Sequence, residues 1–196
     1  LDRSSAASDV YKRQYGEHAT ADQGTCNIPM IIRWPGGVEG QLDDQLHYNL
    51  DLAPTLMELL GGEACPIWDG SSYAATVRNG TAAGHRELII SQCCHVCQRS
   101  VRFGPWLYVR TFHDGFHLFP RELLFNLEDD PHEQRDIAAT HPDICREAAY
   151  RVLNWHQEQM ATVADGVDPL GTVIQEGGPF HARHSGPDSP LPAYLD

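Results

Sequence analysis

The segment from residue 16 to residue 37, GEHATADQGTCNIPMIIRWPGG, joins side chains that could do chemistry to a run that could hold them in place. It begins with polar residues that include His18, Thr20 and Asp22, and it ends in the apolar run 28–34. A histidine can donate a hydrogen bond to an anion or transfer a proton near neutral pH. The pattern is typical of the rim of an active site, and an ordinary loop is the alternative.

A second group of reactive side chains lies in CCHVCQRS, residues 93–100. Its cysteines and His95 could bind zinc, but no second ligand pair follows, and structural zinc draws its ligands from two segments. Cys93 and Arg99 have the spacing of a tyrosine-phosphatase loop, but the glycines that turn backbone N–H groups onto phosphate are missing. We expect a crossing between two strands with small buried thiols. From it, His95 and Arg99 could point into a substrate pocket.

A third group lies in TFHDGFHLFP, residues 111–120, where His113, Asp114 and His117 are flanked by aromatic residues. The two histidines and the aspartate could bind a metal, but the glycine between them favours a turn over a helix. The alternative is a hairpin loop with solvated histidines. The acidic stretch EDDPHEQRD, residues 128–136, lacks the alternating oxygen ligands of a calcium loop, so we expect a solvated turn there.

Composition excludes several classes of protein. The net charge is −13, from 27 acidic and 14 basic residues, which argues against nucleic acid as a partner but allows a locally positive pocket for a small anion. Hydrophobic residues make up 41% of the 196-residue chain, enough for a core. No stretch approaches the roughly 20 apolar residues of a membrane-spanning helix, so we expect no membrane partner.

Two further expectations concern the six cysteines and residues 1–14. The six cysteines are scattered, which predicts reduced structural thiols and leaves the compartment open between cytoplasmic and periplasmic or secreted. Residues 1–14, LDRSSAASDVYKRQ, contain the only lysine, Lys12, and no periodicity. We expect them to be a foreign or disordered leader.

The next elements have an α/β character. Residues 29–34 are predicted to form a buried strand that ends at a Pro-Gly turn. A helix is predicted over NLDLAPTLMELLGG, with Asp51 as its cap, Pro54 in its first turn and Gly61-Gly62 at its end. Residues 63–86 read as a connection with at most one short helix.

The following region predicts an antiparallel sheet and a helix. Strands are expected at 87–93, on both sides of the Gly104-Pro105 turn within 99–112, and at 122–131. A helix should begin at Thr140 and pack a stripe on the sheet, formed by Ile144, Ala148, Val152 and Trp155.

Several of these pieces, in this order, resemble the sulfatase family of the alkaline-phosphatase-like superfamily. IPMIIRWPGG followed by NLDLAPTLMELLGG is similar to a sulfatase strand, Pro-Gly turn and helix. SVRFGPWLYVR, ELLFNLEDDPHEQRDIA and the helix ending in Trp155 resemble the sulfatase C-terminal subdomain. The resemblance runs from about Tyr15 to Trp155 and implies the C-terminal portion of such a protein.

The resemblance implies an α/β fold, with an edge of the central sulfatase sheet and a small C-terminal antiparallel sheet packed on a helix. The expected parts are the end of the catalytic domain at 15–62, a connection at 63–86, the C-terminal subdomain at 87–164 and an irregular tail at 165–196.

The resemblance also implies chemistry. Sulfatases cleave sulfate esters or sulfamates with a formylglycine nucleophile and a calcium ion, but the chain contains no C-x-P-S-R motif and no metal ligands of that family. Both are expected upstream, so this chain alone should be inactive. The alternatives are a phosphodiester or phosphonate hydrolase of the same superfamily and a non-enzymatic binding module.

Individual residues follow from the same resemblance. Many sulfatases place a sulfate-binding lysine eleven residues before the proline of the P-x-I-I-R-x-P-G strand, and His18 stands at that position relative to Pro29. His18 is therefore the expected sulfate-binding or proton-transfer residue. Loops of the C-terminal subdomain often line the substrate, so the expected contacts to a small sulfated sugar or aryl group come from His95, Arg99, His113 and His117. The oligomeric state is left open.

Overall fold

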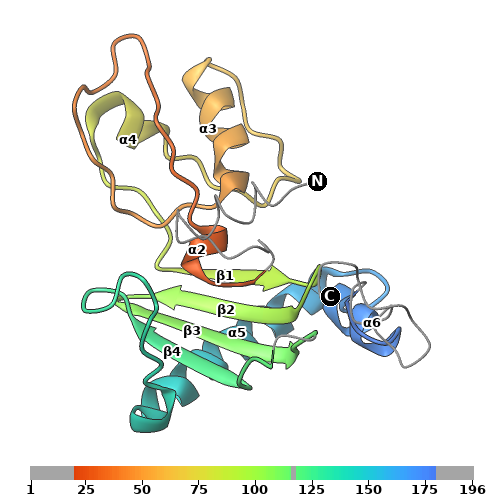
Figure 1. Cartoon of the computed structure of the whole chain (residues 1–196). Coiled ribbons are helices and arrows are strands. Elements are labelled where there is room, and N and C mark those ends of the chain that lie inside the picture. Colours follow the sequence, from red (N-terminus) through yellow and green to blue (C-terminus); the bar gives the residue numbers. More distant parts are fainter. Residues whose placement is uncertain (1–19, 116–117, 180–196) are drawn as a thin grey trace, which may run out of the picture. The chain divides into compact units, whose positions relative to one another are not determined.

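The computed structural model describes residues 20–115 and 118–179, which form two compact units (Figure 1). The first unit contains the described residues up to Ile28 and those from Ile89 onward, and the second is Pro29–Leu88. Residues 20–28 therefore pack with the C-terminal sheet, although the sequence had grouped them with 29–62. The domain boundaries expected from the sequence stay predictions.

The first unit is built on a four-stranded sheet in the order β1 (Glu87–Gln92), β2 (Cys97–Phe103), β3 (Trp106–His113) and β4 (Glu122–Asn126). β2 and β3 are antiparallel, with Phe103 opposite Trp106 across the predicted turn, and β3 and β4 are antiparallel as well. Gly104 has φ +48° in this turn, a conformation that L side chains rarely adopt. The predicted antiparallel sheet is confirmed.

Helix α5 (Pro142–Thr162) covers one face of this sheet (Figure 1). It begins two residues later than expected, because Thr140 ends the short 3-10 helix η2 (Ala138–Thr140) and Pro142 opens α5. Of the predicted stripe, Ala148 and Val152 are buried in the core, and Ile144 and Trp155 pack against it. The core that they share with the sheet contains Ile89, Val101, Phe103, Tyr108, Leu124 and Cys145.

The other face of the sheet buries a second apolar cluster. Its members are Ala21, Leu107, Val109, Phe125 and Leu127. Strand side chains alternate between faces, so Leu107 and Val109 reach this cluster while Tyr108 between them reaches the α5 side. The segment that carries Ala21 continues into the short helix α2 (Gln23–Cys26). The early polar segment is thus part of the sheet's packing.

The chain after α5 contains a short helix where we expected only irregular structure. Helix α6 (Pro169–Gln175) has Pro169 in its first turn, and the Asp168 side chain accepts the Leu170 N–H. Within residues 20–115 and 118–179, none of the helices has the length and apolar character needed to cross a bilayer.

The second unit contains η1 (Asn49–Asp51), α3 (Leu52–Leu59) and α4 (Ala74–Asn79). Pro54 lies in the first turn of α3 as predicted. At its end, Gly61 has φ +81° and its N–H bonds the Glu58 carbonyl at 3.1 Å, while the Gly62 N–H bonds the Met57 carbonyl at 2.9 Å. This pair of bonds confirms the left-handed glycine cap.

The predicted buried strand at 29–34 is wrong for the described structure. These residues form no strand, and Ile31 is 97% exposed. A strand needs a neighbour that accepts and donates its backbone hydrogen bonds. Residues 20–115 and 118–179 offer this run no such neighbour, so its apolar side chains are not covered.

Asp51 has a different role from the one expected. Its side chain makes no capping bond to α3 and instead accepts hydrogen bonds from the Tyr48 N–H at 2.7 Å, the Ser71 N–H at 2.7 Å and His85 Nε2 at 2.9 Å. The residue is fully buried. A buried carboxylate is stable only when hydrogen bonds and a charged or polar partner satisfy it. Asp51 therefore ties three separate segments of the second unit together.

Asp51→Ala should destabilise the second unit by about 3 kcal/mol or more, because two backbone N–H groups and His85 lose a buried acceptor. Urea denaturation measures this loss. Asp43→Ala is the matched control, since Asp43 pairs with His47 at 3.0 Å in a more exposed position. It should cost about 1 kcal/mol or less. Equal losses in the two variants would contradict the role of Asp51.

Candidate functional site

The polar segment after position 19 is held in a compact turn by its own side chains. Asp22 accepts the Thr25 N–H at 2.9 Å and so caps α2, and its other oxygen accepts the Thr20 hydroxyl. The Thr20 and Thr25 hydroxyls lie 3.0 Å apart, and the Cys26 thiol donates to the Thr20 carbonyl at 3.4 Å. The hydroxyl and carboxylate groups singled out in the sequence thus serve this turn.

Two side chains of the C-terminal sheet region bind the backbone of this turn. Gln98 on β2 accepts the Ala21 N–H at 3.0 Å, and its amide nitrogen donates to the Thr111 hydroxyl at 3.2 Å. Glu133, in the turn after β4, accepts the Gln23 N–H at 2.9 Å. The sequence did not predict either contact, because the bonded residues are 77 and 110 positions apart.

His18 and His117 lie outside the described residues, so their expected roles stay predictions. The first described residues after His18 are Thr20 and Ala21. The geometry above therefore concerns the chain immediately following the expected catalytic histidine, not the histidine itself.

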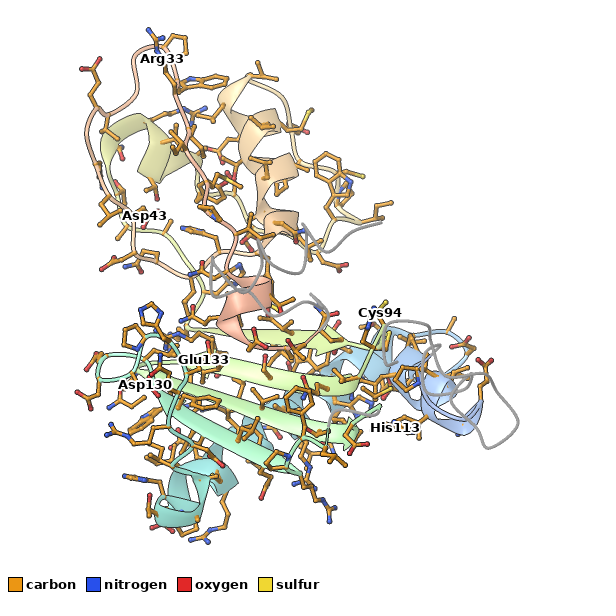
Figure 2. The ribbon with its side chains drawn as sticks, in the orientation of Figure 1. Arg33, Asp43, Cys94, His113, Asp130 and Glu133 are labelled. Atoms are coloured by element: carbon orange, nitrogen blue, oxygen red, sulfur yellow. The ribbon has the colours of Figure 1, made fainter. Side chains whose placement is uncertain are left out.

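Glu133 is a partly buried carboxyl group whose pKa is strongly raised. Burial and, to a smaller extent, the negative charges of Asp22 and Asp130 raise its pKa to about 7, and the hydrogen bond from the Gln23 N–H acts in the opposite direction. Its backbone has φ +52°, which is uncommon for a residue with a side chain. Figure 2 shows Glu133 and Asp130 in the same turn.

This acidity predicts a pH dependence of stability. Because the pKa of Glu133 rises from 4.5 unfolded to about 7 folded, the folded chain binds more protons between those values. Stability contributed by protonated Glu133 is present below pH 4.5 and is lost as the pH rises to 7. Glu133→Gln should remove this decline, so the variant gains stability relative to the original chain as the pH rises.

Urea denaturation at pH 5 and at pH 8 tests this difference. Glu158→Gln is the matched control, because Glu158 is exposed on α5. It should leave the difference between the two pH values unchanged. A decline that persists in Glu133→Gln would show that another group causes it.

His95 and His113 come to the same end of the sheet. Cys97, two residues after His95, lies opposite His113 in the register of β2 and β3. Figure 2 shows His113 and Cys94, the neighbour of His95, at this end. His113 Nδ1 accepts the Gly115 N–H at 3.0 Å, which in the neutral ring leaves the proton on Nε2. The structure thus places two of the predicted substrate residues at the same end of the sheet.

Arg99 is placed differently from His95 and His113. It is 6% exposed, its Nη2 pairs with Asp168 at 2.7 Å, and its Nε donates to the Ser91 hydroxyl at 3.1 Å. The guanidinium also lies 5.5 Å from the centre of the Trp155 ring. To bind a substrate, Arg99 would have to give up this buried ion pair, so its contacts support a structural role.

Asp168 and His156 complete this cluster, and sequence reasoning did not find them. His156 Nε2 lies 3.1 Å from Asp168 Oδ2, while the other carboxylate oxygen serves Arg99 and the Leu170 N–H. The hydrogen bond and the charge of Arg99 lower the pKa of Asp168 despite the opposing effect of its burial. The sequence feature that could have indicated Asp168 is the Asp168-Pro169 pair, because an aspartate followed by proline is typical of the start of a helix.

The cysteines of CCHVCQRS are only partly buried as expected. Cys97 is fully buried, but Cys93 and Cys94 are exposed in the bend between β1 and β2. Both residues lie before Cys97, the first residue of β2, and so stand outside the paired part of the sheet. In the described part of the chain, no three His, Cys, Asp or Glu side chains come together in a way that could hold a metal ion.

Gly178 lies close against the His113 ring. It has φ +93°, and a Cβ atom added there would lie 2.5 Å from His113 Nε2. Gly178→Ala should therefore cost about 1–2 kcal/mol for the backbone and also displace the His113 ring. Urea denaturation measures the first effect, and hydrogen exchange of the Gly115 amide measures the second.

Gly166→Ala is the control for Gly178→Ala, because Gly166 has φ +65° and no atom within 4 Å of an added Cβ. It should share the backbone cost but leave the Gly115 amide protected. Equal exchange at Gly115 in both variants would mean that Gly178 does not fix His113.

Comparisons with known proteins agree with this architecture. No protein-family profile matches the chain. Arylsulfatase K of Danio rerio is 28% identical over 134 residues, covering 64% of this chain and 25% of the relative. The N-acetylgalactosamine-6-O-sulfatase of Bacteroides thetaiotaomicron is 28% identical over 147 residues, covering 67% of this chain and 27% of the relative. The chain is therefore similar to curated sulfatases over about two thirds of its length or more.

The comparisons support a likeness to the C-terminal portion of sulfatases, as the sequence motifs predicted. The chain spans about a quarter of the length of the first two curated relatives. A solved Bacteroides thetaiotaomicron protein of glycosaminoglycan metabolism has the same fold over 74% of this chain and 32% of its own, with 16% identity and a TM-score of 0.51. The α/β fold class expected from the sequence is confirmed.

Proposed function

We propose that this chain is part of a hydrolase that cleaves sulfate esters or sulfamates of a small sugar or aryl substrate. The observation that carries the proposal is the match to curated sulfatases over 64–83% of the chain. Two of these relatives are named for sulfated carbohydrates, N-acetylgalactosamine-6-O-sulfate in one and ulvan in the other. A sulfated sugar is therefore the first substrate class to test.

The role proposed for His18 is to donate a hydrogen bond to a sulfate oxygen or to transfer a proton. Fixed donors around a sulfuryl group stabilise the charge that develops on its oxygens during transfer. Histidine can fill this role near neutral pH, although its positive charge is less permanent than that of the lysine common at this position in sulfatases.

Calcium and formylglycine are part of the proposal for the longer enzyme. The described residues bring no three candidate ligands together, so they do not fit a calcium site, and the sequence contains no C-x-P-S-R motif. Both groups would come from elsewhere in the protein. The contribution proposed for this chain is the placement of His18 and of side chains that contact the substrate.

The test is an assay of the full-length protein with 4-nitrophenyl sulfate, sulfated monosaccharides, 4-nitrophenyl phosphate and a phosphonate monoester. Preferential hydrolysis of the sulfates supports the proposal. Preference for the phosphorus esters would favour the phosphodiester or phosphonate hydrolase, and binding of the sugars without turnover would favour a binding module. The 196-residue chain assayed alone should show no turnover.

His18→Ala in the full-length protein should lower sulfate-ester kcat/KM by about a hundredfold, the loss typical of one positioned proton donor or anion-binding group. His18→Lys is the control, because it restores the residue that many sulfatases carry and should retain most of the activity. Unchanged kcat/KM in His18→Ala would remove His18 from the mechanism.

A further inference from the structure

The turn that ends helix α4 carries a three-residue pattern to which sugar chains are attached in many proteins. Residues 79–81 are Asn-Gly-Thr, and Asn-x-Ser/Thr with x other than proline is the acceptor pattern for N-linked glycans. None of the other asparagines is followed two residues later by serine or threonine: Asn27, Asn49, Asn126 and Asn154. Because so short a pattern also occurs by chance, its structural setting has to decide whether it is an acceptor site.

The backbone of this triplet is fixed to the last turn of α4 (Figure 1). Asn79 is the last residue of the helix, and Gly80 after it has φ +74°, the left-handed conformation typical of a helix end. The Gly80 N–H bonds the Thr76 carbonyl at 3.0 Å, and the Thr76 hydroxyl donates to the Thr81 carbonyl at 2.6 Å. Since Thr76 is buried, these two bonds anchor the triplet to the body of the second unit.

The side chains of the triplet are bonded to each other. Asn79 Oδ1 accepts the Thr81 N–H at 3.1 Å and the Thr81 hydroxyl at 2.7 Å. A backbone N–H can only donate, so the atom that faces it must be the amide oxygen, and the amide nitrogen lies on the opposite side of the group. Within residues 20–115 and 118–179, that nitrogen has no hydrogen-bond partner.

Both ends of the triplet are accessible to a large reagent. Asn79 and Thr81 are exposed, and neither belongs to an apolar core cluster of the described residues. A bulky group on the Asn79 nitrogen would therefore displace no packed side chain and break no hydrogen bond that the described structure contains. The fold can carry such a group without rearrangement.

We propose that Asn79 is an acceptor site for an N-linked oligosaccharide, presented by the turn at the end of α4. The Thr81 hydroxyl contributes by holding the amide oxygen, so that the nitrogen is turned outward. The inference goes beyond the proposed hydrolase activity and does not depend on it.

The reaction needs a donor in which the oligosaccharide is carried on a lipid diphosphate. The Asn79 nitrogen forms a bond to the anomeric carbon of the sugar, and the bond between that carbon and the diphosphate oxygen breaks. The lipid diphosphate leaves with the electron pair, and the nitrogen gives up one proton to a base of the transferase. This donor and its transferase belong to a secretory compartment, which is among those that the cysteine pattern leaves open.

The test is to direct the full-length protein into the secretory pathway of a eukaryotic host with an added signal peptide. Peptide-N-glycosidase F should release a glycan from the folded protein and convert Asn79 to aspartate, which mass spectrometry of the peptide detects. Asn79→Gln and Thr81→Val should each abolish the glycan, because they remove the reacting nitrogen and the hydroxyl. Thr81→Ser keeps a hydroxyl and should keep the glycan.

Asn49→Gln is the matched control, because Asn49 is also exposed but lies outside such a triplet, and the glycan should remain. A secreted protein without a glycan on Asn79 would overturn the proposal. A glycan that persists in Thr81→Val would overturn the role of the hydroxyl, and one that is released only after denaturation would overturn the exposed placement. If a variant is not secreted, translation in the presence of endoplasmic-reticulum microsomes provides the same comparison.

Discussion

The burial of β2 on both faces is the constraint on which the first unit depends. Val101 and Phe103 face the core shared with α5, while Gln98 faces the side on which Ala21 packs. Because successive side chains point to opposite faces, one strand organises both layers at once. A shift of one residue in its register would send polar groups into the helical core and apolar groups toward the polar segment.

Two polar side chains buried on this strand, Gln98 and Arg99, are hydrogen-bonded to partners that are distant in sequence. Gln98 serves the backbone of Ala21, and Arg99, next to it, pairs with Asp168 on the other side of the sheet. Each polar group in the interior costs free energy unless it is hydrogen-bonded, so these contacts favour one arrangement of the chain over others. They also tie the segment that follows His18, and the helix α6, to the same strand.

In the second unit, too, a buried polar side chain is hydrogen-bonded to partners that are distant in sequence, and here that side chain is Asp51. Asp51 collects two backbone donors and His85, and it joins the start of α3 to segments near 71 and 85. Its surface differs, because Ile31, Leu42 and Ile67 are each more than four-fifths exposed. The unit is therefore internally fixed by polar contacts while a large part of its apolar side chains stays uncovered.

The sequence by itself determined the elements that depend on residues close to one another along the chain. The Gly104-Pro105 turn, the proline at the start of α5, the glycine cap after α3 and the order of family motifs were all predicted, because each rests on residues a few positions apart. Two local predictions were wrong. Asp51 does not cap α3, because its carboxylate is hydrogen-bonded elsewhere, and the apolar pattern of the run 29–34 predicts a strand only if a neighbouring strand pairs with it.

Only the tertiary structure decided how the candidate site is assembled. The bonds from Ala21 to Gln98, from Gln23 to Glu133 and from Arg99 to Asp168 join residues 77, 110 and 69 positions apart. No local pattern specifies such partners, because they form only when packing of the sheet excludes water and buried donors must find acceptors within the protein. The sequence therefore indicated candidate reactive residues and a resemblance to sulfatases, and the packing decided which of the described residues are held together.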